Sequence, residues 1–373
     1  MTSIKEVAVL AGVSQSTVSN VFVGRVSVRP ETRRRVLDAA AQLGYCPNGA
    51  AQVLRTGRSR ALGLTVSFVT SPTDAAVVQG ASKVARAAGY VLTVAVTEGN
   101  PEHEGEALDL LARQRVAALI AYAASDDPLP YRELQAGGCP LVFVGGRPRG
   151  VAADLVRSDS YSGTLAAARH LLRQGRRRVG LLLGVPWRET TITRLAAYCD
   201  ALAEFGIARD DALIRLMIRT AAEGYVAAQE LVGAGVDAIL AAVAPATLGV
   251  ASAFADLGVR VPTDVALVGT GDLKWARLLT PPLAMIESNG EELGRMAATL
   301  AIERLNGGQD LPPREFHLPV RFVARGSAGP GIAEAAVAEA SETPSRGVQA
   351  VPSTRSNAKA NLVEAGPVCP ITK

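Results

Sequence analysis

The 373-residue sequence has only four cysteines and three histidines, and 4% of its residues are aromatic. The cysteines lack C-x-x-C spacing and nearby histidines, which favours reduced thiols over a disulfide framework or a zinc site. The histidines share no motif with a nucleophile, and VGTGD (268–272) leaves a G-x-G-x-x-G fingerprint incomplete. We therefore predict no metal, no cofactor and no enzymatic activity. The residues concerned are Cys46, Cys139, Cys199, Cys369, His103, His317 and His170, the last expected to pack or lie at the surface of a helix.

Hydrophobic runs of membrane-spanning length, about twenty residues, are also absent. The N-terminus lacks the apolar segment of a secretory signal. We therefore expect a cytoplasmic protein with no membrane partner. Hydrophobic residues nevertheless make up 48% of the chain, which is enough to fill the cores of two or three domains.

The first twenty-four residues predict two short helices joined by a tight turn. Ser3 and Glu6 have the spacing of a capping box, and Gly12 can end the first helix with a positive φ. Ser14 is placed to cap a second helix over 15–23. This pattern indicates a helix-turn-helix and therefore DNA binding, because such a second helix can enter the major groove.

The second helix turns Val18, Val21 and Phe22 inward and leaves short polar side chains outside. Spacing alone does not distinguish a DNA-reading helix from an ordinary solvated surface helix. A third helix beginning at Pro30 favours the first interpretation, because it can close a small core. Its apolar stripe consists of Val36, Leu37, Ala40 and Leu43.

Positive charge is concentrated in the same part of the chain. Residues 1–60 contain nine Lys or Arg against three Asp or Glu, whereas the whole chain has a formal charge of only +4. The remaining 313 residues are therefore slightly acidic. A basic N-terminal segment is what neutralisation of DNA phosphates requires.

From residue 61 onward, short apolar strands alternate with helical patterns, which is typical of parallel sheets covered on both faces. The fold class predicted is therefore α/β. Beyond Arg325 the composition shifts to small residues and proline, and we expect a disordered tail over 328–373. The expected strands are ALGLTVS, YVLTVAV, AALIAY, PLVFVGG, RVGLLLG, DAILAAV and DVALVG.

Several segments, in order, resemble the lactose-repressor (LacI) family of bacterial transcriptional regulators over about residues 3–327. They are IKEVAVLAGVSQSTVSNVFVG, RPETRRRVLDAAAQLGYCPN, AQVLRTGRSRALGL, RSDSYSGTLAAARHLLRQGRRRVGLLLG, VPTDVALVGTGD, LLTPPLAMI and EELGRMAATLAIERLNGG. The resemblance implies a repressor that binds a double-stranded, pseudo-palindromic operator as a homodimer and responds to a small-molecule effector.

The resemblance also implies a domain order. A three-helix DNA-binding domain over 1–47 precedes a hinge helix and linker over 48–60. A periplasmic-binding-protein-like core over 61–327 follows, with two lobes joined by three crossovers. Lobe one comprises 61–158 and 288–317, and lobe two comprises 159–287 and 318–327.

The resemblance assigns roles to residues of the second helix and the hinge. Gln15 and Ser16 occupy positions that vary with operator sequence, whereas Thr17 and Ser19 are expected to hold phosphates beside the cap Ser14. Many relatives have arginine in place of Asn20 and asparagine in place of Val23, so Asn20 is expected to read adenine. In the hinge, Leu54 would wedge into the minor groove next to Arg55 and Asn48, although a flexible linker is the alternative. Phosphate contacts or a solvated helix face both remain open for Arg25, Arg29, Arg33, Arg34 and Arg35.

The effector cleft departs from the family pattern, because Gly145, Val243 and Gly271 replace three polar anchors. A hexose pocket is therefore not favoured, since buried hydroxyl groups without partners cost about 1–3 kcal/mol each. Arg194, Thr190 and Arg219 remain, with Asp74 and Asp272 as acids and Trp187 and Trp275 as apolar walls.

Two arginines with fewer carboxylates favour an anionic or amphipathic effector. Pairing of Arg194 with Asp74 or Asp272 across an empty cleft is the alternative. An effector-independent regulator with a degenerate cleft, or a solute-binding protein with the same core, also stays open. The operator, the effector, the regulatory logic, the controlled genes and the role of the tail are not readable from the sequence.

Overall fold

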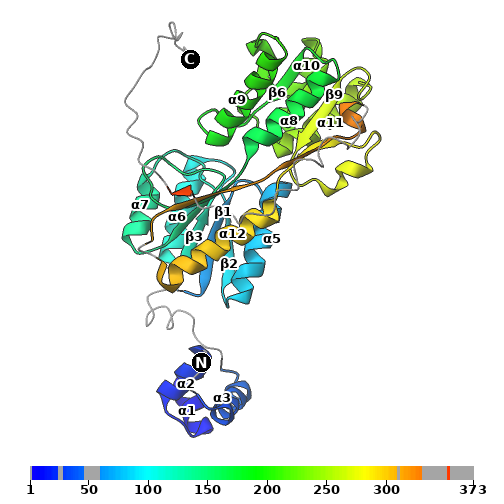
Figure 1. Cartoon of the computed structure of the whole chain (residues 1–373). Helices are drawn as coiled ribbons and strands as arrows, with labels where there is room; N and C mark the ends of the chain where they lie inside the picture. Colours follow the sequence, from blue (N-terminus) through cyan, green and yellow to red (C-terminus); the bar gives the residue numbers. More distant parts are fainter. Residues whose placement is uncertain (1, 24–27, 46–58, 309–310, 330–350, 353–373) are drawn as a thin grey trace, which may run out of the picture.

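The computed structural model describes residues 2–23, 28–45, 59–308, 311–329 and 351–352. Three N-terminal helices form a small bundle, and the rest of the described chain forms an α/β core with two sheets (Figure 1). None of the described helices is both long and apolar enough to span a bilayer. The bundle consists of α1 (Ile4–Ala11), α2 (Gln15–Val23) and α3 (Pro30–Gln42).

The first lobe contains a seven-stranded sheet in the order β13-β11-β5-β4-β3-β1-β2. All its pairings are parallel except that of β13 with β11. One apolar core lies between the sheet and the helices α5 and α12, and a second lies under α6 and α7. The bounds are β1 (Ala61–Val66), α5 (Pro72–Ala87), β2 (Val91–Val96), α6 (Pro101–Arg113), β3 (Ala118–Ala121), α7 (Leu129–Ala136), β4 (Leu141–Val144), β5 (Asp154–Ser158), α12 (Gly290–Glu303), β11 (Arg314–Leu318) and β13 (Val351–Pro352).

The second lobe contains a six-stranded sheet in the order β12-β10-β9-β8-β6-β7. Helices α8 and α9 cover one face and α10 and α11 cover the other. The bounds are α8 (Ser160–Arg173), β6 (Val179–Leu182), α9 (Glu189–Glu204), β7 (Ile214–Arg215), α10 (Ala221–Gly233), β8 (Ala238–Ala241), α11 (Ala244–Leu257), β9 (Ala266–Thr270), β10 (Ala284–Glu287) and β12 (Arg321–Val323), with short helical turns at Asp211–Leu213, Lys274–Leu278, Arg304–Gly308 and Gly326–Ala328.

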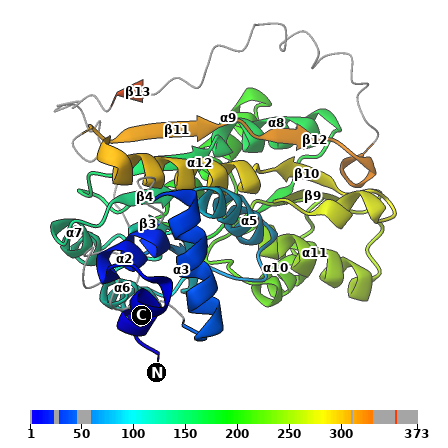
Figure 2. The same cartoon turned by 90° about the horizontal axis from the view of Figure 1, so that it is seen from below.

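From β1 to β12 the chain passes between the two sheets three times, after β5, after β10 and after β11. Figure 2 shows β11 and β12 following one another along one side of the molecule. The prediction of a two-lobed α/β core with parallel sheets is confirmed. Each strand expected from an apolar run corresponds to an observed strand.

Two details of the C-terminal part differ from the expectation. Ala328 is fully buried, and the buried hydroxyl of Ser327 donates to the carbonyl of Leu267 at 2.6 Å. The core therefore continues through Ala328 instead of ending at residue 327. Val351–Pro352, within the predicted disordered tail, pairs with β11.

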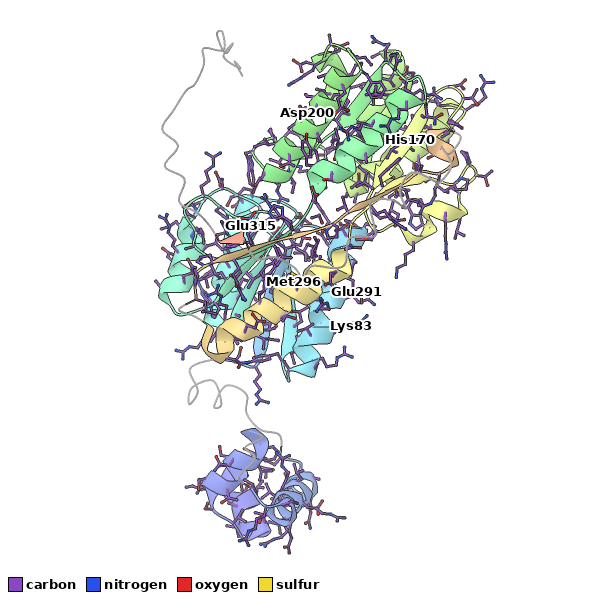
Figure 3. The ribbon with its side chains drawn as sticks, in the orientation of Figure 1. Lys83, His170, Asp200, Glu291, Met296 and Glu315 are labelled. Atoms are coloured by element: carbon purple, nitrogen blue, oxygen red, sulfur yellow. The ribbon has the colours of Figure 1, made fainter. Side chains whose placement is uncertain are left out.

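His170 packs inside the second lobe. Of the two placements expected for it, packing and the helix surface, the structure shows packing. The side chain lies on α8 and is 7% exposed (Figure 3). Its ring centroid is 5.2 Å from that of Phe322 on β12. Burial lowers the pKa of His170, although a hydrogen bond with the backbone of Ala328 opposes this shift.

Candidate nucleic-acid interface and ligand cleft

The two N-terminal helices end and begin as their sequence predicts. The Ser3 backbone N–H donates to Glu6 Oε2 at 2.7 Å, and the Glu6 N–H donates to Ser3 Oγ at 3.4 Å, which completes the capping box. Gly12 has a φ of 62° and ends α1. The Thr17 N–H donates to Ser14 Oγ at 3.1 Å, so Ser14 caps α2.

The bundle buries one face of each helix and leaves the polar face of α2 accessible. Val18 and Val21 are buried in the bundle core, as predicted. Leu37 was expected there too, but it is 46% exposed and lies outside the core. On α2, Gln15 and Ser16 are exposed, and Thr17, Ser19 and Asn20 are partly exposed. The residues assigned to DNA reading therefore share a face that a groove can reach.

Two of the five arginines considered for phosphate contacts bind the bundle itself. Arg35 Nη2 donates to the carbonyl of Ala11 at 2.5 Å, at the C-terminal end of α1. Arg33 Nη2 donates to the carbonyl of Val21 at 3.4 Å. Cations at helix C-termini stabilise the helix, so these two arginines stabilise the ends of α1 and α2. Arg25, Asn48, Leu54 and Arg55 lie outside the described residues, as does the side chain of Val23.

A cavity of about 430 Å³ lies between the two lobes. Loops that follow β1, β3 and β4 line it on one side, and the starts of α9 and α11 line it on the other. Ligands of open α/β sheets bind at such strand ends. The cavity is therefore the candidate ligand site.

Five of the seven predicted effector residues line this cavity, and two do not. Thr190, Arg194, Arg219, Trp187 and Asp74 contribute to its wall. Trp275 and Asp272 are not among the residues that line the cavity, and their role in effector binding stays a prediction. Trp275 lies on the short turn Lys274–Leu278, and Asp272 Oδ2 accepts from Ser288 Oγ and the Gly290 N–H, both at 3.2 Å.

Asp74 lines the cavity, but its carboxylate organises the loop after β1. Oδ2 accepts from the N–H groups of Ser67 at 3.0 Å and Phe68 at 2.9 Å, and Oδ1 accepts from Ser71 Oγ at 3.1 Å. Burial raises the pKa of Asp74 despite these donors. The carboxylate is thus already engaged within its own lobe.

Arg194 lines the cavity without a described carboxylate partner. Its Nη1 donates to the carbonyl of Ala242 at 2.5 Å, and it forms no ion pair with any described carboxylate. The alternative pairing with Asp74 or Asp272 is therefore wrong, since both acids have other partners. Burial lowers the pKa of Arg194 to about 10. Arg194 is partly buried, and a partly desolvated guanidinium without a counter-charge favours binding of an anion.

Arg219 differs from Arg194 because it has a partner. Its Nη2 lies 3.4 Å from Glu223 Oε1, and its backbone N–H donates to Glu223 Oε2 at 2.6 Å. Arg219 is thus part of the capped start of α10 at the edge of the cavity.

Sequence reasoning missed two neighbouring residues that bridge the lobes. Arg188, at the start of α9 in lobe two, donates from Nη2 to the carbonyl of Ala123 in lobe one at 2.7 Å. Glu189 forms an ion pair with Arg157 of β5. An Arg-Glu pair at a helix start is too common for its sequence to indicate such contacts, because the partners are more than thirty residues away.

Comparison with known proteins identifies the family. Residues 3–48 match the bacterial regulatory proteins of the lacI family, and residues 168–328 match the periplasmic binding protein-like domain. The chain is 33% identical over 332 residues to the HTH-type transcriptional regulator CelR of Thermobifida fusca, covering 86% of this chain and 97% of the relative. The chain belongs to the LacI family. It is therefore a DNA-binding transcriptional regulator and not an enzyme.

Other relatives extend the similarity over most of the LacI-family chain. The HTH-type transcriptional repressor PurR of Pasteurella multocida is 28% identical, covering 82% of this chain and 92% of the relative. A CelR–cellobiose complex aligns with a TM-score of 0.64 at 31% identity, covering 88% of this chain and all of the other. A lac repressor dimer bound to operator and the anti-inducer ONPF aligns with a TM-score of 0.73 at 26% identity, covering 88% and 99%.

Proposed function

We propose that this LacI-family regulator is a repressor that binds a pseudo-palindromic operator as a homodimer and that an effector in the inter-lobe cavity controls this binding. The observation that carries the proposal is the combination, in one chain, of an accessible polar face on α2 and a cavity between two bridged lobes. Similarity to the lac repressor dimer on operator supports it.

The polar side chains of α2 would read the DNA. Gln15 and Ser16 lie in the first turn, where side chains of a recognition helix reach base edges. Asn20 lies further along the same helix and can pair with adenine N6 and N7. Thr17 and Ser19 would hold phosphates and fix the register of the helix.

Dimerisation follows from the small reach of one helix. A single α2 contacts only a few base pairs, whereas two copies related by a two-fold axis read two half-sites. The operator is then expected to contain inverted half-sites.

Effector control requires two lobe arrangements of similar free energy. Arg188 and Glu189 bridge the lobes at the start of α9, so a ligand that competes with or reinforces these contacts shifts the population of closed lobes. A coupling of about 1–3 kcal/mol is typical of such regulators.

The same bridges favour a second candidate function, an effector-independent regulator. Protein contacts alone already connect the lobes, because the Arg188–Ala123 hydrogen bond and the Arg157–Glu189 ion pair need no ligand. Such a regulator would bind its operator with the same affinity in every metabolite mixture.

Deletion of residues 1–60 tests the proposal in a mobility-shift assay with DNA selected by the full chain. We expect the deleted chain to lose specific binding. Double substitution of Gln15 and Ser16 by alanine, which leaves the bundle core intact, should reduce specific binding more than non-specific binding. Specific binding that survives the deletion would contradict the DNA-binding role of the bundle.

A further inference from the structure

The start of α11 brings three features of the cavity wall into contact. Arg194 Nη1 donates to the carbonyl of Ala242, which immediately precedes the helix. The Thr270 backbone N–H donates to Thr247 Oγ1, in the first turns of the helix, at 3.2 Å. Arg194, Thr270 and the N-terminus of α11 therefore form one continuous part of the lobe-two wall.

This part of the wall contains an unused hydrogen-bonding group. Thr270 is 5% exposed, and its hydroxyl has no partner among the described residues. Buried hydroxyls nearly always have partners, so an unpartnered one that lines a cavity indicates a missing ligand. The Arg188 Nε, in the same cavity, is also buried without a partner.

The electrostatics of this wall favour negative charge. The N-cap residue of α11 is Val243, whose side chain cannot accept a hydrogen bond from the first turn, so the positive end of the helix dipole lies at the cavity without a side-chain cap. Arg194 adds a full positive charge that no described carboxylate balances. An anion here would gain charge-assisted hydrogen bonds from a guanidinium and a hydroxyl.

The acids that line the cavity already have donors from the protein, with which sugar hydroxyl groups would have to compete. Asp74 accepts from its own loop, Asp126 accepts from the Arg149 N–H at 3.0 Å, and Glu189 pairs with Arg157. Gly145 and Val243 also line the cavity and offer no polar side chain. Sugar hydroxyl groups bound here would therefore lack strong acceptors.

We propose that the effector carries a carboxylate or phosphate group and that this group binds at Arg194, Thr270 and the start of α11. This inference rests on the proposed function, because it names the chemical class of the effector in the same cavity. Phe68, Trp187 and Ile218 line the cavity as well and provide an apolar wall for the body of such a molecule.

Binding of small probes to the full chain tests this proposal. Sodium phosphate and sodium citrate represent the two anionic groups, and glucose, ribose and cellobiose represent neutral sugars. Isothermal titration calorimetry and thermal denaturation are performed at constant ionic strength. We expect phosphate or citrate to bind and raise the melting temperature, and the stronger of the two identifies the anionic group.

Three variants locate the binding. Arg194→Gln should weaken binding of the anionic probe by about 10- to 100-fold, as loss of a charged hydrogen-bond donor does. Thr270→Val should weaken it too without destabilising the free chain, because the hydroxyl has no partner to lose. The control Arg149→Gln removes an exposed cavity arginine and should change affinity by less than about 2-fold.

Binding of a neutral sugar with no binding of either acid would overturn the proposal. Equal losses in Arg149→Gln and in both Arg194→Gln and Thr270→Val would also overturn it, because the anion would then respond only to overall charge. Operator binding is measured separately, with and without the probes. Its absence under both conditions would refute the proposed function, whereas operator binding without acid binding would refute only the anionic effector.

Discussion

Asn20 is the residue of α2 at which we expect the base preference to depart from the family pattern, because many relatives have arginine there. Its amide can pair with adenine, whereas arginine at this place pairs with guanine O6 and N7. We predict that Asn20→Arg changes the preferred base at one position of each half-site instead of strengthening binding to all sequences. A shift of about 1–3 kcal/mol in the relative affinity for the two bases is expected from competition binding.

The Asn20→Ala variant is the matched control for that experiment. It should lose discrimination at the same position without acquiring a new preference. Uniformly tighter binding of the Asn20→Arg variant to every sequence would mean that position 20 contacts phosphate and not bases.

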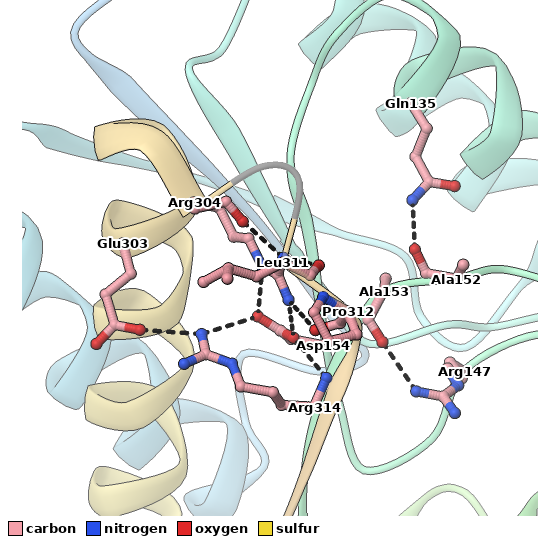
Figure 4. Close-up of polar contacts among 11 residues, drawn as sticks. Gln135, Arg147, Ala152, Ala153, Asp154, Glu303, Arg304, Leu311, Pro312 and Arg314 are labelled. Carbon is pink, nitrogen blue, oxygen red and sulfur yellow. Dashed lines mark hydrogen bonds and ion pairs between the residues drawn. The ribbon is translucent and has the colours of Figure 1, made fainter. Parts of the chain in front are cut away.

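Asp154 is the most deeply buried charge of lobe one (Figure 4). Arg304 donates to its two oxygens at 2.5 and 2.9 Å, and the Arg314 N–H donates at 2.8 Å. Burial alone would raise the pKa of Asp154, but these donors outweigh it and lower the pKa. The network joins the end of α12 to the neighbouring strands β5 and β11.

We predict that Asp154→Asn lowers the free energy of unfolding by about 3–5 kcal/mol, because Arg304 is left as an uncompensated buried charge. A carboxyl group with a depressed pKa stabilises the fold above its unfolded value of about 3.9. This contribution disappears as the pH falls through the lower folded pKa. Urea denaturation at a series of pH values from 7 downward should therefore show that the free energy of unfolding depends less on pH in the variant than in the wild-type chain.

The exposed pair of Asp109 and Arg113 provides the control. Asp109→Asn should cost less than about 1 kcal/mol, as exposed ion pairs do. A loss in Asp154→Asn no larger than in this control would show that the buried network contributes little to stability.

At the scale of elements, glycine sets how closely the helices of lobe one pack. A Cβ at Gly294 of α12 would lie 2.0 Å from the carbonyl oxygen of Val77 in α5, and one at Gly80 would lie 1.9 Å from that of Glu291. Lys83 and Glu291 join the same two helices by an ion pair at 2.5 Å (Figure 3). Backbones therefore meet directly at this crossing, where no side chain fits.

Gly294→Ala should force α5 and α12 apart. The expected loss in the free energy of unfolding is about 1–3 kcal/mol or more, because overpacking usually costs this much. Gly105→Ala is the control, because a Cβ at this position of α6 meets nothing within 4 Å. Replacing a helical glycine there should stabilise by about 0.5–1 kcal/mol. Thermal denaturation of both variants separates the α5–α12 backbone contact from helix propensity. Equal changes in melting temperature would contradict the close packing of α5 against α12.

Local chemistry explains which elements the sequence could predict. The capping box at Ser3 and the apolar strands depend on neighbouring residues, so their patterns indicated them correctly. Strands β5, β11 and β12 were not expected, because they carry Asp154, His317 and Arg321 and lack a continuous apolar run. The ion pairs of these strands join residues far apart in the chain, which no local pattern contains.

The candidate cleft shows the same limit. Arg194 and Thr190 are four residues apart on α9 and were assigned together correctly to the cavity wall. Trp275 was chosen as an apolar wall and Asp272 as an acid near the arginines, but neither lines the cavity, and Asp272 instead accepts a hydrogen bond from Ser288, which does line it. The bridge from Arg188 to Ala123 depends on the closeness of the two lobes, which no local pattern contains.

At the scale of the whole molecule, the proposed function requires the bridges at the start of α9 to connect effector binding with DNA binding. We predict that the double variant Arg188→Ala, Glu189→Gln favours open lobes and changes operator affinity by about 5- to 150-fold, the range of a typical allosteric coupling. Small-angle X-ray scattering should show a larger radius of gyration for the variant. Its control is Arg169→Gln, which removes an ion pair with Glu204 inside lobe two.

The control should leave both the radius of gyration and the operator affinity unchanged, because α8 and α9 belong to the same lobe. If the double variant behaves like the control, the lobe arrangement does not depend on these bridges. Operator affinity would then have to respond to the cavity by another route.

Selection of DNA from a random double-stranded library by the full chain tests the central claim most directly, since it examines dimeric, sequence-specific recognition by α2. We predict that the selected sequences contain two inverted half-sites and that alanine at Gln15 and Ser16 alters the selected bases symmetrically in both. Enrichment of sequences without inverted symmetry, or identical selection by the wild-type and variant chains, would contradict the account.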